Sequence, residues 1–336
     1  MKPRFLEILR CPHDDSEFRV DKKVEEGGEI VDGLLTCVGP QAHRYPIIGG
    51  IPRIIDDVTP DNLVQNYAAS FGFQWTQFAW EDPESNLREF WNTTDFDNNF
   101  LKGKVFLDAG CGGGRTTAQL PALVKEIVYL DYSVAVEKVY KTCGHLPNTH
   151  FVQASVAHPP LKREIFDVVF CSGVLHHTND TYESFKGLPP MVRPGGYLHV
   201  YIFKKADWPT RVFHLSDHAV RAAVSRMPRD QAIAFCKLIG VLQTIPSLRW
   251  LKAFFWFSMK PDPEVRLTHN HDWYACRYHH EHTLNELIGW FVDHGFKSIG
   301  YINGWPEAPG VERYEIPRWI KSQRLGLSMT VHGTKR

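Results

Sequence analysis

The sequence predicts an α/β fold, in which helices cover a sheet whose strands are mostly parallel. Apolar residues 105–107 read as a buried strand that runs directly into a glycine-rich turn. Further apolar, strand-like segments alternate with helix-compatible stretches; they are EIVYLD, HFVQAS and FDVVFCS. With 336 residues, of which 43% are hydrophobic, the chain can fill the core of one large domain with appendages.

Four glycines among the five positions 110–114 form a turn that leaves no room for a Cβ atom. We expect a helix over 116–124 after this turn, so that backbone N–H groups and a helix N-terminus face a ligand. Asp108 lies two residues before the first glycine and completes a DxGxGxG spacing. The dinucleotide motif GxGxxG has no fixed carboxylate at this position, because a carboxylate would repel the pyrophosphate. The carboxylate of Asp108 instead favours a ligand that carries an ammonium group.

This motif resembles that of the class I S-adenosylmethionine-dependent methyltransferases, whose cofactor carries an amine and a sulfonium. The resemblance implies a seven-stranded Rossmann-like methyltransferase sheet whose last strand is antiparallel, S-adenosylmethionine as the cofactor, and methyl transfer as the activity. Two strand-like segments near the end of the chain, FKSIGYI and LSMTVHG, agree with that architecture. Within the motif, the resemblance assigns to the cofactor Asp108, Gly110, Cys111, Gly112 and Gly114.

A second acidic residue, Asp131, ends the next strand, 23 positions after Asp108. A carboxylate there can accept hydrogen bonds from a ribose diol, and the resemblance assigns it this role; the alternative is a helix cap. Tyr132 would flank the adenine. After the third strand the family has an aspartate that binds the adenine amino group, whereas this chain has Ser155. We therefore expect Ser155 and the backbone of Ser155 and Val156 to make that contact.

The fourth strand, 166–170, opens into the sequence CSGVLHH. Ligands of parallel α/β sheets bind beyond the carboxyl ends of the strands, so this segment is predicted to lie at the reaction edge. Its LHH signature is similar to that of the methyltransferases, and we assign Cys171 and Ser172 to the cofactor. We expect His177 or His176 to take the proton of a hydroxyl or acidic-carbon acceptor; the alternative is that both histidines pack beside the turn.

Residues 1–58 are predicted to form a small β-module in front of the core. LEILRCP and YPIIGGIPRII resemble the zinc-ribbon-like activator subunits of tRNA methyltransferases. The metal set of that family is two CxxC pairs, but here Asp14 and Pro40 stand where the second cysteines would fall. We expect a metal-free module that packs on its neighbour through Ile47, Ile48, Ile51, Ile54 and Ile55. The alternative is a mixed zinc site formed by Cys11, Cys37, His43 and either His13 or Asp14.

The segments on either side of the core have their own patterns. The aromatic-rich segment before it resembles the lid that closes over the cofactor in fused enzymes of this type, with Tyr67, Phe71 and Gln74 as contacts; the alternative is that its rings pack in the core or between domains. Five histidines lie between His269 and His282, but without tight ligand spacing, so we expect no metal there. The predicted division is a β-module at 1–58, an aromatic lid at 59–103, a cofactor-binding core at 104–204, a helical insert at 205–268 and a completion of the core at 269–336.

The helical insert is predicted to cap the substrate. Its stretch 219–260 contains seven Lys or Arg against one acid amid apolar residues, a pattern that also suits transient contact with a membrane or lipid. The alternative is an ordinary solvated cap over the core.

The balance of charges bears on partners and location. The formal net charge is +0 and the pI is about 7.3, so we do not expect a nucleic-acid partner. The seven cysteines are scattered and no apolar run has membrane-spanning length, which favours a cytoplasmic protein. The sequence thus predicts an S-adenosylmethionine-dependent methyltransferase that acts on a small or lipophilic metabolite. Two alternatives stay open: a tRNA or rRNA methyltransferase, and a non-catalytic S-adenosylmethionine-binding scaffold.

Overall fold

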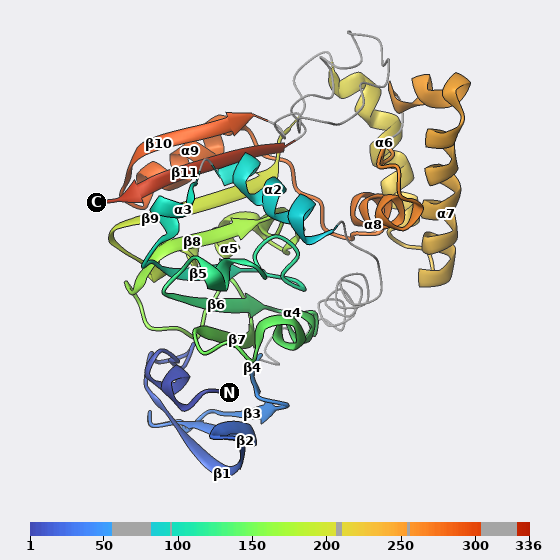
Figure 1. Cartoon of the computed structure of the whole chain (residues 1–336). Helices are drawn as coiled ribbons and strands as arrows, with labels where there is room; N and C mark the ends of the chain where they lie inside the picture. The colour runs from blue at the N-terminus through green and yellow to red at the C-terminus, as the bar shows by residue number, and fades with distance from the viewer. Residues whose placement is uncertain (56–81, 95, 206–209, 254–255, 304–327) are drawn as a thin grey trace.

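A mixed sheet runs through the molecule (Figure 1). The computed structural model describes residues 1–55, 82–94, 96–205, 210–253, 256–303 and 328–336. Within these residues the sheet has 11 strands in the order β1-β2-β3-β4-β7-β6-β5-β8-β9-β11-β10. The strands are β1 Phe18–Glu26, β2 Glu29–Cys37, β3 Arg44–Ile48, β4 Ile51–Ile54, β5 Val105–Ala109, β6 Glu126–Asp131, β7 Thr149–Ala154, β8 Phe166–Ser172, β9 Val192–Phe203, β10 Phe296–Asn303 and β11 Ser328–Lys335.

The strands from β4 to β9 in this order are parallel to their neighbours, and β11 is antiparallel to both β9 and β10. The expected count of seven strands is not confirmed for this sheet, because the four strands of the β-module continue the seven strands β5 to β11. Arg53 and Ile54 of β4 pair in parallel with Gln153 and Ala154 of β7. The pairing covers an edge of the parallel core that would otherwise present unpaired backbone groups.

Helices cover both faces of the parallel strands. They are α2 Pro83–Thr94, α3 Asn98–Leu101, α4 Val136–Cys143, α5 Thr181–Lys186, α6 Thr210–Val224, α7 Arg229–Val241, α8 Pro263–Tyr274 and α9 Leu284–Asp293, with 3-10 turns η1 Pro3–Glu7, η2 Leu120–Ala122, η3 Leu175–His177, η4 Pro189–Met191, η5 Leu242–Thr244 and η6 Pro246–Ala253. Alternate side chains of each strand enter opposite cores: Phe106 packs with α2 and α4, whereas Leu107 packs with α5 and α9.

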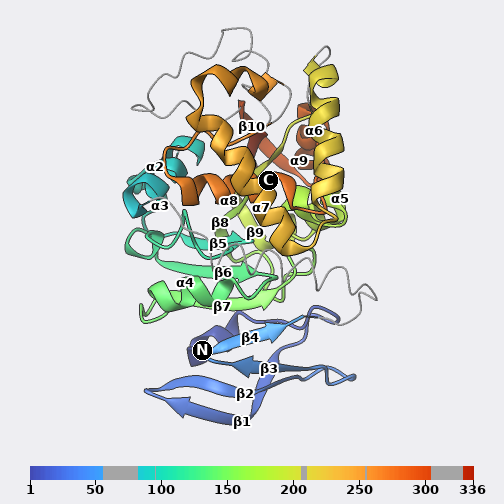
Figure 2. The same cartoon turned by 90° about the vertical axis from the view of Figure 1, so that its right-hand side faces the viewer.

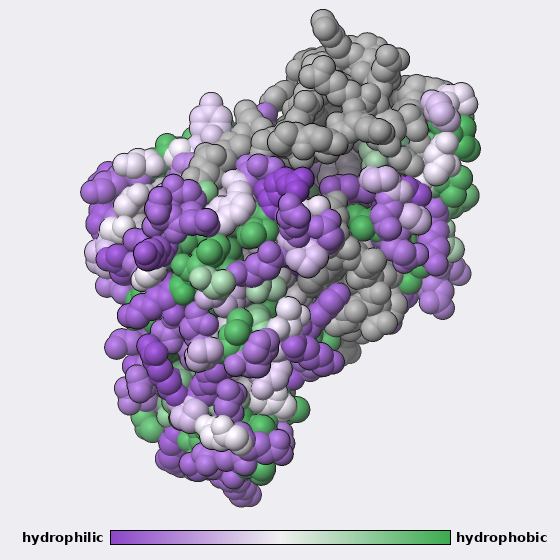
Figure 3. Space-filling model, in the orientation of Figure 1, coloured by the Kyte–Doolittle hydropathy of each residue, from purple (hydrophilic) through white to green (hydrophobic). Residues whose placement is uncertain are grey.

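Helices α6, α7 and α8 form a layer of their own at the end of the molecule away from β1 (Figures 1 and 2). Their shared core includes Cys236, Phe257 and Trp273, and reaches the sheet through Phe203 at the end of β9. The predicted insert boundary at 268 falls inside α8. Hydrophobic atoms are exposed along the outer edge where α7 lies (Figure 3). Among the described helices, none is long and apolar enough to cross a membrane.

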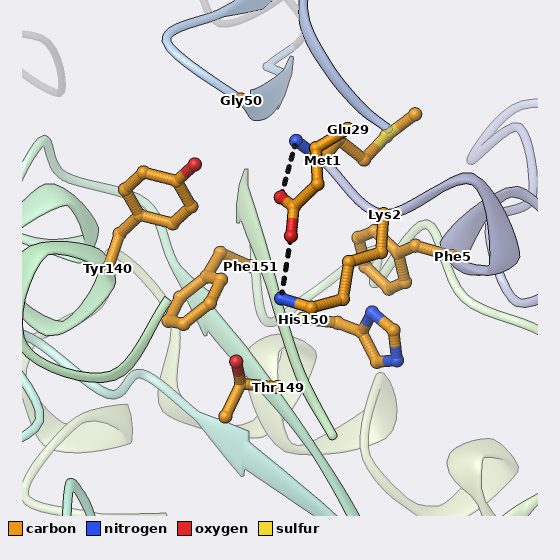
Figure 4. Close-up of a pocket in the computed structure, with 9 residues that line it drawn as sticks. All are labelled: Met1, Lys2, Phe5, Glu29, Gly50, Tyr140, Thr149, His150 and Phe151. Atoms are coloured by element: carbon orange, nitrogen blue, oxygen red, sulfur yellow. Dashed lines mark ion pairs between the residues drawn. The ribbon is translucent and has the colours of Figure 1, made fainter. Parts of the chain in front are cut away.

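The β-module is joined to the core by side chains as well as by β4. Phe5 stacks on His150 of β7 with ring centroids 4.9 Å apart, and the His150 Nε2 lies 2.6 Å from Glu126 Oε1. Figure 4 shows Phe5 and His150 at a small pocket between the module and β7. In this pocket the carboxylate of Glu29 lies between Lys2 and the amino group of Met1. This pocket belongs to the packing of the module on β7.

The isoleucines of the module were expected to pack it on its neighbour, but they are not all buried. Ile47, Ile51 and Ile54 are buried, but Ile48 is 52% exposed, because its side chain points to the opposite face of β3.

Candidate active site

The glycine turn follows β5 and lies against the end of β6. The N–H groups of Gly110 and Cys111 donate to the carbonyl oxygen of Leu130, at 2.7 and 3.0 Å. Gly110 has φ +89°, and a Cβ there would lie 2.3 Å from Cγ2 of Val174. Gly114 has φ +77°, and a Cβ there would lie 2.4 Å from Val139. Both positions therefore require glycine, for conformation and for space.

The prediction of a helix over 116–124 is wrong. The chain forms turns as far as η2, and the reason lies in one carbonyl group. In a helix the Thr117 carbonyl would accept from the N–H of residue 121, but Pro121 has none. Instead that carbonyl accepts from the buried hydroxyl of Tyr129, at 2.9 Å. The backbone groups available to a ligand here come from the glycine turn, with no helix N-terminus.

Asp108 is the buried acid at the end of β5. Its side chain is almost entirely enclosed, and the hydroxyl of Thr117 donates to its Oδ2. Burial raises the pKa of Asp108 to about 7, with a smaller contribution from the charge of Asp131 and an opposing one from the Thr117 hydrogen bond. Asp108 thus changes charge near neutral pH. Sequence reasoning missed Thr117, because its position nine residues after Asp108 has meaning only in the folded chain.

Asp131 holds the glycine turn in place. Its Oδ2 accepts from the Gly112 N–H at 2.7 Å, and its Oδ1 accepts from the N–H and hydroxyl of Ser133. The alternative role as a helix cap is not observed, because Ala135 is the N-cap residue of α4. Tyr132 follows directly and uses its carbonyl oxygen to accept from Gln153.

The other predicted cofactor residues follow neighbouring strands. Ser155 and Val156 come directly after β7; the first is half-buried and the second is buried. Cys171 and Ser172 end β8, whose pairing with β5 places them beside the glycine turn. The structure therefore brings the residues predicted after β5, β6, β7 and β8 to one edge of the sheet. Tyr67, Phe71 and Gln74 lie outside the described residues.

His176 and His177 are buried in η3, just past β8. The ring of His176 stacks on Phe203 with centroids 3.8 Å apart. Nδ1 of His177 lies 2.9 Å from the carbonyl oxygen of Tyr278. Burial is the main cause that lowers the pKa of both imidazoles, so both are neutral at pH 7.

Two groups of side chains in the described part of the chain have the composition and spacing of metal ligands. The first lies in the β-module and consists of Cys11, Asp14, Cys37 and His43. Nδ1 of His43 lies 3.4 Å from Sγ of Cys11 and 3.6 Å from Sγ of Cys37. His13 stacks on His43 instead, with centroids 4.1 Å apart. The second lies near η3 and consists of His177, Asp272 and Cys276.

Comparison with known proteins identifies the segment that carries this edge. Residues 107–200 match the family described as "Methyltransferase domain". This segment contains the glycine turn, both acidic residues and both histidines.

Among relatives, a tRNA U34 carboxymethyltransferase of Desulfotalea psychrophila is 32% identical over 121 residues, which are 35% of this chain and 38% of that protein. A ubiquinone biosynthesis O-methyltransferase of Shewanella pealeana is 26% identical over 136 residues, 38% of this chain and 58% of that protein. The chain thus spans less than two thirds of the length of either relative.

Two solved structures are among those found by comparison. The complex between the Haloferax volcanii Trm112 methyltransferase activator and a methyltransferase has a TM-score of 0.47 and 11% identity, and covers 79% of this chain and 96% of that one. The YcgJ protein of Bacillus subtilis has a TM-score of 0.39 and 14% identity, and covers 70% and 92%. At these scores neither structure bears on the function of the present chain.

Proposed function

We propose that this chain, which carries a class I S-adenosylmethionine-dependent methyltransferase domain at residues 107–200, transfers the methyl group of that cofactor to a small or lipophilic acceptor. The prediction of such a methyltransferase is confirmed for this domain. The observation that carries the proposal for the whole chain is the convergence of Asp108, the glycine turn and Asp131 at one edge of the sheet.

The chemistry of these residues fits the cofactor. Asp108, when ionised, offers a negative charge to the amino group, directly or through water. The glycine turn allows close approach to the backbone, and Asp131 keeps lone pairs for a ribose hydroxyl beside the bonds it already accepts. The bound cofactor supplies a methyl group on a sulfonium, which is a good leaving group. The protein therefore needs mainly to align the acceptor and exclude water.

Calorimetry with the full chain tests this assignment. We expect S-adenosylmethionine and its demethylated product to bind, and Asp108→Asn to weaken cofactor binding by tenfold or more, because a charge-assisted contact is lost. Asp97→Asn, which alters only the cap of α3, is the matched control. A nicotinamide dinucleotide that binds in place of the cofactor, or an Asp108→Asn variant with unchanged affinity, would contradict the proposal.

A second candidate acceptor is tRNA. The Desulfotalea relative is named for a tRNA nucleoside, and the β-module resembles activators of tRNA methyltransferases. The Desulfotalea relative does not support our expectation that the protein has no nucleic-acid partner. Incubation with methyl-labelled cofactor distinguishes the candidates: we expect label in a host metabolite extract. Label in bulk tRNA, with salt-sensitive binding, would favour the second candidate, and label in neither would favour the scaffold.

We also propose that the β-module holds a zinc ion, in place of the metal-free module expected from the sequence. Zinc bonds of about 2.3 Å to sulfur and 2.0 Å to nitrogen, at the tetrahedral angle, separate the two ligand atoms by about 3.5 Å. The separations between His43 and the two cysteine sulfurs agree with this value. Asp14 completes a set of four protein ligands, the number typical of structural zinc.

Metal analysis of the full chain tests the zinc proposal. We expect Cys37→Ser to lose one zinc equivalent and to lower the thermal stability of the protein, because metal binding contributes to folding. Cys236→Ser changes a buried cysteine outside the ligand group and is the control. A protein whose zinc content and response to a chelator do not change with Cys37→Ser would overturn it.

A further inference from the structure

We propose that His177, Asp272 and Cys276 form a binding site for a divalent metal ion, with zinc as the best fit, at the reaction edge of the sheet. One ligand atom from each residue lies within 4.8 Å of the others. His177 and Cys276 are buried and Asp272 is half-buried. The site joins η3, which follows β8, to the end of α8, which lies beyond the carboxyl ends of the parallel strands (Figure 1).

The chemistry of the three donors favours zinc. An imidazole nitrogen, a carboxylate oxygen and a thiolate sulfur are all ligands of this borderline-soft cation. The charges of one carboxylate and one thiolate balance a dication, so the loaded site is neutral and suits its buried position. Three protein ligands are the number found in catalytic zinc sites, which leave the fourth position to water or substrate.

A second observation concerns the orientation of His177. Its Nδ1 lies 2.9 Å from the carbonyl oxygen of Tyr278, so the proton is on Nδ1 and the lone pair is on Nε2. Histidine ligands of metals commonly donate their other N–H to a carbonyl oxygen in this way, which fixes the ring. Backbone bonds hold that carbonyl in place, because the N–H of His280 donates to the His176 carbonyl and the N–H of His282 donates to that of Phe203.

The site has a consequence for the acceptor, and this step rests on the proposed function. An alcohol, phenol or thiol that binds at such a cation loses its proton more readily. In the transfer, the acceptor's proton leaves to solvent and its lone pair forms the bond to the methyl carbon. The electrons of the broken carbon–sulfur bond return to the cofactor sulfur. His177 is then a ligand, which replaces the role of base predicted for it from the sequence.

Cobalt titration of the metal-stripped full chain tests the site without reference to activity. Because the β-module has its own ligand group, the experiment uses Cys37→Ser as background, with Cys11→Ser as a second background should the first fold poorly. We expect one Co²⁺ equivalent with a thiolate-to-cobalt absorption band. Adding Cys276→Ser removes the band, and adding Asp272→Asn weakens binding. Cys236→Ser is the matched control and retains the band.

The outcomes separate the two proposals. A background protein that takes up no cobalt, or one whose uptake is unchanged by Cys276→Ser and Asp272→Asn, overturns the metal site. Calorimetry with S-adenosylmethionine on the same samples reports on the cofactor edge independently. Metal uptake without cofactor binding therefore contradicts the proposed function alone, and cofactor binding without metal uptake contradicts this inference alone.

Discussion

At the scale of single residues, the site depends on one buried carboxyl group and the hydroxyl that contacts it. Asp108 lies between neutral and charged forms at physiological pH, because burial disfavours the charge while the Thr117 hydrogen bond favours it. A cationic cofactor would favour the charged form. Occupancy of the site and ionisation of Asp108 are therefore expected to be coupled.

The coupling predicts a pH dependence of cofactor affinity. With a pKa of about 7, the ionised fraction of Asp108 rises about tenfold between pH 6 and pH 8, so affinity measured by calorimetry should rise by about the same factor. The stability of the cofactor-free protein has the opposite sign. Because folding raises the pKa of Asp108, its protonated carboxyl group contributes to the stability of the folded protein at low pH. That contribution is lost as pH rises through 7.

Asp108→Asn should therefore flatten the affinity profile and raise the melting temperature of the cofactor-free protein at pH 8. A variant that keeps the wild-type affinity profile would show that another group is responsible.

Thr117 is predicted to act as a positioning residue for Asp108. Thr117→Val removes a hydrogen bond to a buried charge, a contact with a typical contribution of about 1.5–3 kcal/mol. We expect the pH midpoint of cofactor binding to move upward and the affinity at pH 7 to fall about tenfold. Thr117→Ser keeps the hydroxyl and should restore both. If Val and Ser behave alike in calorimetry, the hydroxyl has no such role.

At the scale of elements, the strand–turn unit could be predicted from the sequence, whereas the segment after it could not. The apolar run, Asp108 and the glycines are neighbours in the chain, so their pattern reports directly on local backbone. The failure of the helix over 116–124 depends on Pro121 and on a hydroxyl from β6, which only the fold brings near. The capping box of Thr283 and Glu286 at the start of α9 is another arrangement between residues that are close in the chain.

The glycine turn supports a prediction about stability. Gly110→Ala adds a Cβ that meets Val174 at a positive φ, and we expect a loss of about 2–4 kcal/mol in the free energy of unfolding. Gly103 has a similar φ of +76° with nothing within 4 Å, so Gly103→Ala is the matched control, with a loss of about 1 kcal/mol. The measurement is urea unfolding. Equal losses would show that Val174 does not crowd the turn, and Val174→Ala should recover part of the difference.

The stretch 219–260, for which contact with lipid is predicted, includes helix α7. Leu238 and Val241 of α7 are exposed beside the exposed Lys237, and Ile245, beyond the end of α7, is exposed as well. Arg221, which the sequence placed in the basic stretch, is instead buried near Asp217 and Glu281, so the surface is less basic than expected.

We expect the protein to sediment with anionic vesicles at low salt, and Leu238→Glu with Val241→Glu to abolish this, because both apolar area and charge attraction are lost. Val292→Glu, at an exposed site on α9, is the control. Wild-type protein that stays in the supernatant would exclude this role of α7.

At the scale of the whole molecule, the chain combines segments that the sequence treats as separate. The β-module shares a sheet and a core with the methyltransferase domain, since Phe5, Leu9 and Ile54 pack with residues of β5 to β9. The resemblance of LEILRCP and YPIIGGIPRII to activator subunits suggested the module, but the pairing of β4 with β7 has no local signal. The same holds for the second ligand group, because His177 lies far along the chain from Asp272 and Cys276, whereas the ligand group of the β-module was an alternative already offered by the sequence. The division of the chain into five segments stays a prediction.

A crystal structure of the full chain with the demethylated cofactor shows whether this edge of the sheet binds the cofactor. We expect the ribose hydroxyls at Asp131, the amino group near Asp108 and the nucleoside over the glycine turn. A product bound elsewhere, with the turn and both carboxylates making no contact to it, would rule out the proposed cofactor site.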